Sequence, residues 1–299
     1  MTTPLPKNPP SPFVAKLTAF SKTFFTLANK TFRILLLVFF LALFTFPFLW
    51  LISASLKARP DVFNNAWIPN PVSWQNYVIV WSFAPILTWF KNSIIVAILA
   101  AASVVISCSL VAFGFSYFRF PGRDFLFTLV LASMMLPGAV TMIPTFMIWS
   151  KLNLVDSLTP LWAGNLFGSA FYIFMMRQFF LTLPRELFEA ARVDGAGYFR
   201  LWRDIALPLT RNSMIVVFIF ELKASWTDLM KPLIYLQSPE FYTLPRGLKT
   251  VLDRFGQGGE MRWEIILAAS VLVTIPMIVI FFMGQKYFME GISTTGIKR

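Results

Sequence analysis

The stretch ILLLVFFLALFTFPFLWLISA (Ile34–Ala54) contains no charged residue. A helix of about twenty apolar residues crosses the roughly 30 Å hydrocarbon core of a bilayer, at about 1.5 Å per residue. A secretory signal peptide has an apolar segment of only about 7–15 residues and a shorter leader, so we interpret the stretch as a retained membrane helix. Residues 1–33 are polar and proline-rich, and we expect them to form a partly disordered N-terminal tail.

Five further apolar runs follow, and the overall composition agrees with them. Of the 299 residues 57% are hydrophobic and only 13% are charged, against about 25% charged in an ordinary soluble domain. The sequence therefore predicts an all-α integral membrane protein. The six predicted transmembrane helices cover residues 34–54, 92–117, 125–149, 161–180, 213–236 and 265–288, within one transmembrane domain over 34–290. Residues 291–299 form the predicted C-terminal tail.

We interpret the formal net charge of +12 as a sign of membrane topology and not of nucleic-acid binding. Most of the 26 Lys and Arg residues fall in the two tails and in the loops on the same side as the tails. Because cytoplasmic segments of membrane proteins are enriched in Lys and Arg, both termini are predicted to be cytoplasmic. The chain has no histidine and one cysteine, Cys108, which excludes a His or Cys metal site and an intrachain disulfide.

A charged stretch, EAARVDGAG (Glu189–Gly197), lies in the longest predicted cytoplasmic loop, between the fourth and fifth spans. Pro184 and Glu186 suit the first turn of a helix. The helical spacing places Leu183, Leu187, Ala190 and Ala191 on one face. Gly195 and Gly197 are expected to end this helix, and a second short helix, Tyr198–Asp204, is expected to end before Pro208. The pattern leaves two interpretations open: the hairpin packs on the chain's own helices, or it binds a partner.

Polar residues also lie in or beside the fifth predicted span. On one continuous helix they form an arc of roughly 160°, and they are Glu221, Ser225, Thr227, Asp228 and Lys231. Ionisable residues in a membrane usually face a cavity or a partner. One interpretation is that these residues line the route of a polar solute. The other is that Asp228 and Lys231 form a structural ion pair three residues apart.

The same loop carries a family resemblance. Its residues match the pattern E-A-A, three residues, G, nine residues, I-x-L-P, through Glu189, Ala190, Ala191, Gly195, Ile205, Leu207 and Pro208. The chain thus resembles the permease subunits of binding-protein-dependent ABC importers, in their carbohydrate-type branch and as the shorter, six-span member of the permease pair. Further similar stretches are SLKARPDVF, WIPNPVSWQNY, NSIIVA, FPGRD, the pair Pro137 and Pro144, and SWTDLMKPLIYL. The last departs from the family pattern at Thr227 and Lys231, which leaves the solute open.

The resemblance implies that the loop is a coupling helix seated in a groove of an ATPase subunit. Glu189 would pair with a basic group, Ala190 and Ala191 would permit close docking, and Gly195 would supply the turn. The implied coupling residues are Glu189, Ala190, Ala191, Asp194, Gly195, Ile205, Leu207 and Pro208. The implied partners are a second homologous permease, two ATP-binding subunits, an extracytoplasmic solute-binding protein and the lipid bilayer, in a bacterial cytoplasmic (inner) membrane.

The chain itself lacks the residues of an enzyme. It has no phosphate-binding G-x-x-x-x-G-K-[ST] loop and no histidine for a Ser-His-Asp set. No cofactor is expected on this chain, and the resemblance places ATP and Mg²⁺ on the partner ATPase. The predicted function is the alternating-access import of a sugar or sugar-like polyol. The alternatives are a proton-coupled secondary transporter that uses Glu221 or Asp228, and a membrane scaffold that recruits an unrelated partner.

Overall fold

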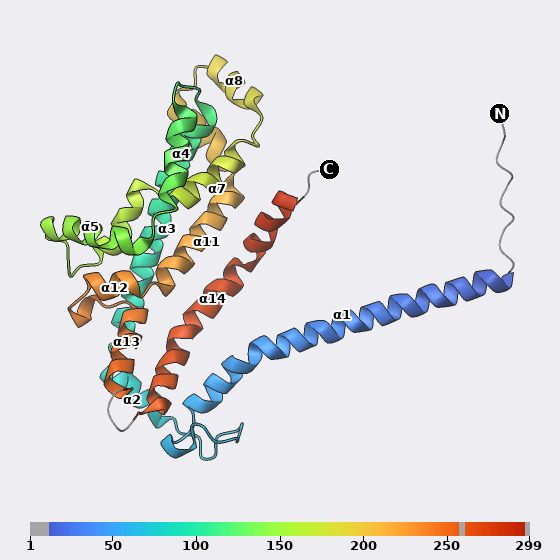
Figure 1. The fold of residues 1–299 in the computed structure, drawn as a ribbon, viewed down its shortest axis with the longest axis vertical. Helices are drawn as coiled ribbons and strands as arrows, with labels where there is room; N and C mark the ends of the chain where they lie inside the picture. Colours follow the sequence, from blue (N-terminus) through green and yellow to red (C-terminus); the bar gives the residue numbers. More distant parts are fainter. Residues whose placement is uncertain (1–11, 257–260, 297–299) are drawn as a thin grey trace.

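The computed structural model describes residues 12–256 and 261–296, and within these ranges every regular element is a helix. The α-helices are α1 (Pro12–Ser55), α2 (Gln75–Phe83), α3 (Ile86–Tyr117), α4 (Arg123–Ser133), α5 (Gly138–Lys151), α6 (Thr159–Trp162), α7 (Ala170–Phe180), α8 (Arg185–Val193), α9 (Tyr198–Arg200), α10 (Leu207–Leu209), α11 (Arg211–Thr227), α12 (Met230–Tyr235), α13 (Leu244–Phe255) and α14 (Trp263–Gly296). Short 3₁₀-helices cover Arg59–Asp61 (η1), Ala163–Phe167 (η2) and Pro239–Phe241 (η4), and a π-helical segment covers Leu201–Ala206 (η3). The predicted all-α fold class is confirmed (Figure 1).

Among the described residues, three helices are long and apolar enough to cross a membrane: Asn29–Ser55 within α1, the whole of α3, and Trp263–Phe282 within α14. Two bent helix pairs raise this number to as many as five if each pair counts as one span. The first, second and sixth predicted spans therefore have continuous helices at their positions. The count of six spans and the cytoplasmic placement of both termini stay predictions.

The third predicted span, 125–149, is wrong as a single straight helix. It is divided into α4 and α5, whose axes differ by 97°. Pro137 precedes α5 with extended backbone angles, and α4 has already ended at Ser133. The division follows from the proline, because a proline disfavours helical angles in the residue before it.

The fourth predicted span, 161–180, is also wrong as a continuous helix. The chain forms α6, then η2, and resumes as α7 only at Ala170. Gly168 between them has φ of +85°, a conformation that L-residues with a side chain rarely adopt. The break therefore depends on a glycine inside an otherwise apolar run.

The fifth predicted span, 213–236, ends early as a helix. Helix α11 stops at Thr227, Asp228 has extended angles of −68° and 121°, and α12 starts at Met230. The predicted polar arc assumed one continuous helix, so its angular placement of Lys231 beyond the break is wrong. Residues 228–229 instead form a non-helical link between two helices.

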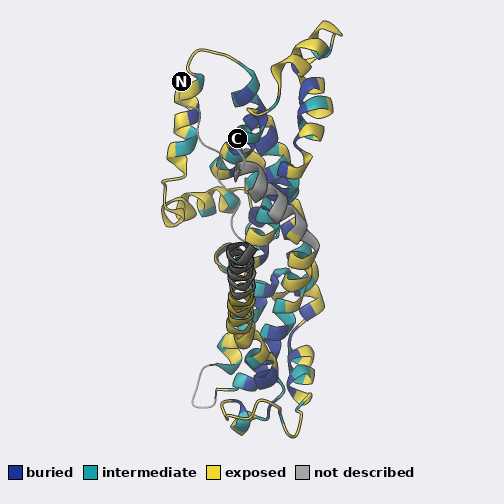
Figure 2. Ribbon diagram, turned by 90° about the vertical axis from the view of Figure 1, so that its right-hand side faces the viewer, coloured by how far each residue is buried: buried dark blue, intermediate teal, exposed yellow. Residues whose placement is uncertain are grey.

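The ends of the chain are more helical than predicted. Helix α1 begins at Pro12, inside the predicted N-terminal tail, and α14 continues through Gly296 into the predicted C-terminal tail. The rest of each tail, residues 1–11 and 297–299, lies outside the described residues. Figure 1 shows α1 projecting from the other helices, and residues 29–49 are all exposed along it. Figure 2, which looks along α1, colours the chain by burial.

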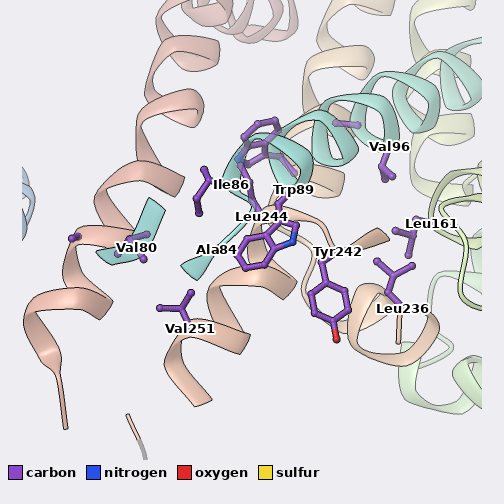
Figure 3. Packing of buried hydrophobic residues seen from close by; sticks show 14 of the residues in the cluster. Val80, Ala84, Ile86, Trp89, Val96, Leu161, Leu236, Tyr242, Leu244 and Val251 are labelled. Atoms are coloured by element: carbon purple, nitrogen blue, oxygen red, sulfur yellow. The ribbon is translucent and has the colours of Figure 1, made fainter. Parts of the chain in front are cut away.

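Helix α3 belongs to two separate hydrophobic cores. At the end of the molecule that holds α13, the first half of α3 contributes Trp89 to a cluster that also contains Tyr242, Leu244 and Val251 (Figure 3). At the end that holds α8, the second half of α3 contributes Phe113 to a cluster that also contains Phe180, Phe188 and Leu201. We call these the α13 end and the α8 end. One helix thereby connects the two ends mechanically.

The predicted external loop 237–264 is largely structured at the α13 end. Trp89 donates from Nε1 to the carbonyl of Pro239 over 3.1 Å. Asn92 donates from Nδ2 to the carbonyls of Glu240 (2.8 Å) and Tyr242 (3.0 Å). A Cβ on Gly247 of α13 would lie 2.0 Å from Cε3 of Trp89, so the glycine lets α13 lie directly against the indole.

Candidate functional site

The hairpin at the α8 end is built from α8, a turn over residues 194–197, and the segment from α9 to α10. Pro184 precedes α8 with extended angles, and Glu186 lies in the first turn, where its negative charge is favourable. The predicted helix and the predicted turn are both present. The second helix differs from the prediction, because Leu207 keeps helical angles and the chain stays helical through Pro208 to Leu209.

Phe188 anchors α8 to the bundle. Its side chain is 5% exposed and lies against the rings of Phe113 and Tyr117 in the last turns of α3, with ring centroids 6.1 and 5.5 Å away. Leu187 and Ala190, two members of the face that the helical spacing predicts, are both exposed, so the chain's own helices do not cover this part of the face. The buried face is instead centred on Phe188, with Ala191 partly buried beside it. The ring of Phe188 determines the orientation of this short helix, because burying a large aromatic side chain stabilises the fold more than burying an alanine.

The turn after α8 requires its first glycine. Gly195 has φ of +83°, while Gly197 has φ of −72° and needs no glycine-specific conformation. Arg192 crosses the turn, because its guanidinium carbon lies 4.5 Å from the ring centroid of Tyr198 and its Nη1 donates to the carbonyl of Ala196 over 3.2 Å. These contacts fix the angle between the two arms of the hairpin.

The predicted coupling residues differ in exposure along the hairpin, from an exposed edge of α8 to a partly buried second arm. Glu189, Ala190, Asp194, Gly195 and Pro208 are exposed, whereas Ala191, Ile205 and Leu207 are partly buried. Val193, at the tip of α8, is 88% exposed. The edge is thus small, apolar and acidic, and a solvent-exposed apolar surface of this kind is typical of a contact with another protein.

The second arm of the hairpin leads directly into the bundle. Leu201, Trp202 and Ala206 of η3 are buried in the α8-end cluster. The helix then turns by 82° at Thr210 into α11. A displacement of the hairpin must therefore move α3 through Phe188 and α11 through this bend.

A buried polar cluster surrounds Glu221 in α11. Its carboxylate is 8% exposed and its Oε1 accepts hydrogen bonds from Asn165 Nδ2 (2.7 Å) and Ser225 Oγ (3.0 Å). Asn165 lies in η2, at the break in the fourth predicted span. Its carbonyl accepts a bond from Ser107 of α3 over 2.8 Å. The cluster joins three segments of the bundle at the interruption of the fourth predicted span.

The other predicted pathway residues lie elsewhere. Asp228 and Lys231 flank the break between α11 and α12, with Oδ2 and Nζ 3.9 Å apart, and Asp228 Oδ1 also accepts the backbone N–H of Lys231 over 3.2 Å. Thr227 is exposed, and its hydroxyl donates to the carbonyl of Lys223 over 3.1 Å. The five predicted residues thus separate into a hydrogen-bonded pair, Glu221 and Ser225, an ion pair at a helix break, and one exposed threonine.

Sequence reasoning missed Asn165 and Phe188. Asn165 stands between Gly164 and Gly168 in an apolar run, and a polar residue flanked by glycines there is a signal for a break. Phe188 lies one residue before the E-A-A segment, where only its size distinguishes it from its apolar neighbours. Neither residue type alone indicates a ligand site.

These observations define an all-helical membrane protein with an exposed hairpin at one end. The family described as binding-protein-dependent transport system inner membrane component matches residues 106–293. The chain belongs to this family and is an inner-membrane permease component of an ABC importer.

Two curated relatives extend the comparison along the chain. The arabinooligosaccharides transport system permease protein AraQ of Bacillus subtilis (strain 168) is 32% identical over 277 residues, which are 90% of this chain and 97% of AraQ. The sn-glycerol-3-phosphate transport system permease protein UgpE of Yersinia enterocolitica is 33% identical over 231 residues, 75% of this chain and 81% of UgpE. These relatives transport different solutes, so the family does not fix the solute of this chain.

The fold is shared with a solved structure of a bacterial ABC transporter involved in the import of the acidic polysaccharide alginate. The match has a TM-score of 0.76 at 21% identity and covers 96% of this chain and all of the other. A second structure, of the bacterial alginate ABC transporter in complex with an alginate pentasaccharide-bound periplasmic protein, matches with a TM-score of 0.61 and 16% identity. At these identities the likeness concerns the fold.

Proposed function

We propose that this chain moves a sugar or sugar-like polyol across the inner membrane by alternating access, driven by ATP that separate subunits hydrolyse. The observation that supports this proposal most directly is the structure of the hairpin. It presents an exposed edge with Glu189 and Ala190, and Phe188 anchors it against the end of α3. A rigid root is what a mechanical link requires, because a flexible loop would absorb motion instead of transmitting it.

The proposed partner of the hairpin is an ATP-binding subunit. Glu189 pairs with a basic group there, and Ala190, which has almost no side chain, allows the two surfaces to approach closely. Exposed apolar groups at Leu187 and Val193 supply the buried area of the contact. ATP and Mg²⁺ bind to that subunit, and closing of the ATP-binding subunits pushes on α8.

The proposed second permease lies against α1 and the other exposed helix faces. Helix α1 projects from the bundle (Figure 1) with residues 29–49 exposed, and α5 exposes Val140, Ile143 and Met147. A homologous chain with the same surfaces would provide a cover for both, with lipid around the outside. A solute-binding protein would deliver the solute at the α13 end, opposite the hairpin.

We place the solute route at the break between α11 and α12. Helix breaks leave backbone groups free to contact a polar solute, and here Thr227 and Lys231 are exposed beside the break. Asp228 and Lys231 line the route as an ion pair. A negatively charged sugar can therefore replace the carboxylate of Asp228 as the partner of the Lys231 ammonium group. Glu221 and Ser225 support the route from inside the bundle, because their polar atoms already bind each other and Asn165.

A proton-coupled secondary transporter would also contain broken helices, so the breaks alone do not distinguish the two mechanisms. The family membership favours ATP. Transport by proteoliposomes that responds to internal or external ATP, and not to an imposed proton gradient, is the discriminating result.

The direct test is co-purification. The detergent-solubilised wild-type chain should bring down an ATP-binding subunit, and Glu189→Lys and Gly195→Asp should lose it or uncouple ATP hydrolysis from transport. Glu240→Lys is the matched control, because it reverses an exposed charge at the α13 end, far from the hairpin. A wild-type chain that purifies alone, or variants that behave like Glu240→Lys, would refute the proposed coupling role.

A further inference from the structure

Four arginines converge on one hollow at the α8 end that the proposed transport function does not use. The hollow has a volume of about 550 Å³ and is bounded by the end of α3, the start of α4, the end of α7 and the start of α8. Its basic residues are Arg119, Arg123, Arg177 and Arg185, and its one acidic residue is Asp124. Three of these lie in the stretch FRFPGRD (residues 118–124): Arg119 in the connection between α3 and α4, and Arg123 and Asp124 at the start of α4.

The positive charge in the hollow is not neutralised by the part of the chain that the structure describes. Asp124 pairs with its neighbour Arg123, with Oδ1 and Nη2 2.9 Å apart. Within the described residues no carboxylate forms an ion pair with Arg119, Arg177 or Arg185. Arginines crowded without counter-charge repel one another, so an anion in the hollow lowers their free energy.

Arg177 is held in position for such an anion. Its guanidinium lies 4.2 Å from the ring centroid of Phe127, and its Nε donates to the carbonyl of Phe115 over 3.4 Å. These contacts use the face and the Nε edge of the guanidinium and leave its two terminal nitrogens for a ligand. Arginine forks match the oxygen geometry of phosphate groups, often with two parallel hydrogen bonds.

The surroundings of the hollow match the depth of lipid headgroups. Just beyond Asp124 on α4, Phe125, Leu126 and Leu129 are 45–67% exposed and form an apolar flank. A basic hollow with an apolar flank fits a phospholipid, whose phosphate meets the arginines while its acyl chains lie along the helix. A soluble phosphate compound would use the arginines but not this flank.

The geometry points to a binding site for the phosphate of an anionic phospholipid in the leaflet at the α8 end. Because Arg185 is the first residue of α8, a bound phosphate also fixes the start of the hairpin. The composition of the membrane would then influence how firmly the hairpin is held. This inference is independent of the solute and of the assignment of the hairpin to an ATP-binding subunit.

The test measures lipid retained by the full chain, purified in detergent with the subunits it assembles with. Dioleoylphosphatidylglycerol or dioleoylphosphatidylcholine is added, and retained lipid is counted by native mass spectrometry. Wild type should retain the anionic lipid preferentially. Arg119→Gln/Arg123→Gln should weaken its binding about thirtyfold, which corresponds to about 1 kcal/mol for each basic residue near a membrane surface.

Two further variants make the result specific. Arg200→Gln/Arg203→Gln removes the same charge from exposed residues outside the hollow and should leave retention unchanged. Arg119→Lys/Arg123→Lys keeps the charge and should recover much of the binding, which shows that loss in the glutamine variant is not misfolding.

Three outcomes would overturn the inference. Equal retention of the two lipids, or equal loss in the glutamine variant and its charge-matched control, would show that the hollow is not the site. Binding of inorganic phosphate that depends on the arginines, without arginine-dependent lipid retention, would make the ligand a soluble phosphate. Loss of an assembled subunit with unchanged lipid retention would assign the arginines to an acidic surface of that subunit.

Discussion

Asn165 Nδ2 and Glu221 Oε1 are 2.7 Å apart, so the interruption of one membrane segment is bonded to the middle of another. The amide lies in η2, where the helix is broken, and the carboxylate is almost fully buried in α11. A broken helix leaves backbone groups unpaired, and in a membrane these need partners from neighbouring segments. Ser107 provides one of them by donating to the carbonyl of Asn165. The bond therefore holds the break in one conformation.

We predict that Asn165→Ala destabilises the chain. It removes the shorter of the two hydrogen bonds that the buried Glu221 Oε1 accepts and leaves the one from Ser225, and a hydrogen bond typically contributes about 0.5–1.5 kcal/mol. Thermal unfolding in detergent should show a lower midpoint for Asn165→Ala, with little change for Gln178→Ala on the exposed face of α7. Equal midpoints for the two variants would contradict a supporting role for this bond.

We predict that Gly195→Ala impairs the hairpin while Gly197→Ala does not. A Cβ meets no atom within 4 Å at either position, so packing is not the difference. The φ of +83° at Gly195 costs an L-residue about 1–2 kcal/mol, whereas φ is −72° at Gly197. Transport per ATP hydrolysed, measured in proteoliposomes, should fall only for the first variant. A fall of the same size for both would point to the composition of the turn rather than its backbone geometry.

We predict that Gly247→Ala disturbs the α13 end. The added Cβ would overlap the indole of Trp89, and overpacking of a core typically costs about 1–3 kcal/mol. Limited proteolysis should cut the 237–264 region faster in this variant. Gly138→Ala is the control, since its Cβ would meet nothing within 4 Å. Wild-type cleavage rates in Gly247→Ala would contradict the prediction, because they would mean that α13 shifts away from Trp89 without loss of stability.

We predict a pH dependence at the link between Asp156 and the residues after α12. Hydrogen bonds from the Ser238 hydroxyl and from the backbone N–H groups of Ser238 and Gln237 hold the pKa of Asp156 below its usual value of 3.8. A folded-state pKa that is lowered stabilises the protein above the unfolded pKa, and this contribution is lost as pH falls through the folded value.

The check compares wild type with Asp156→Asn, whose amide does not titrate. The wild type should unfold at a higher temperature at pH 7. The difference should begin to shrink below about pH 3.8 and should vanish at still lower pH. A difference that stays constant down to the lowest accessible pH would show that the carboxylate charge does not contribute.

The sequence was sufficient for features that depend on long runs or on a spaced pattern. Ile34–Ala54 and the other unbroken apolar stretches are helices, and the E-A-A segment forms the helix and turn of the hairpin. Hydrophobicity counted over twenty residues is insensitive to one residue, so it did not reveal the breaks at Gly168 and Asp228. Each break is a local backbone event that becomes favourable only when another segment supplies hydrogen bonds.

The spacing of apolar residues left open which face of α8 the chain itself covers. Spacing identified Leu187 and Ala190 as members of a face, but it gave no information on what lies opposite. The aromatic side chains at the end of α3 decide that Phe188 is buried there. Periodicity predicts that a helix has faces, and tertiary packing decides which of them is covered.

The long reach of α3 has a consequence for how the chain is made. The side-chain amide of Asn92 is bonded to the carbonyl of Tyr242, which lies 150 residues later in the chain. At a synthesis rate of about 5–20 residues per second, Asn92 leaves the ribosome roughly 8–30 s before Tyr242 does. Throughout that interval the start of α3 exists without α13 or the segment that follows α12. A nascent chain halted before residue 237 therefore exposes the Asn92 amide without its carbonyl partners and Trp89 without the segment that covers it. These two features distinguish it from the complete chain.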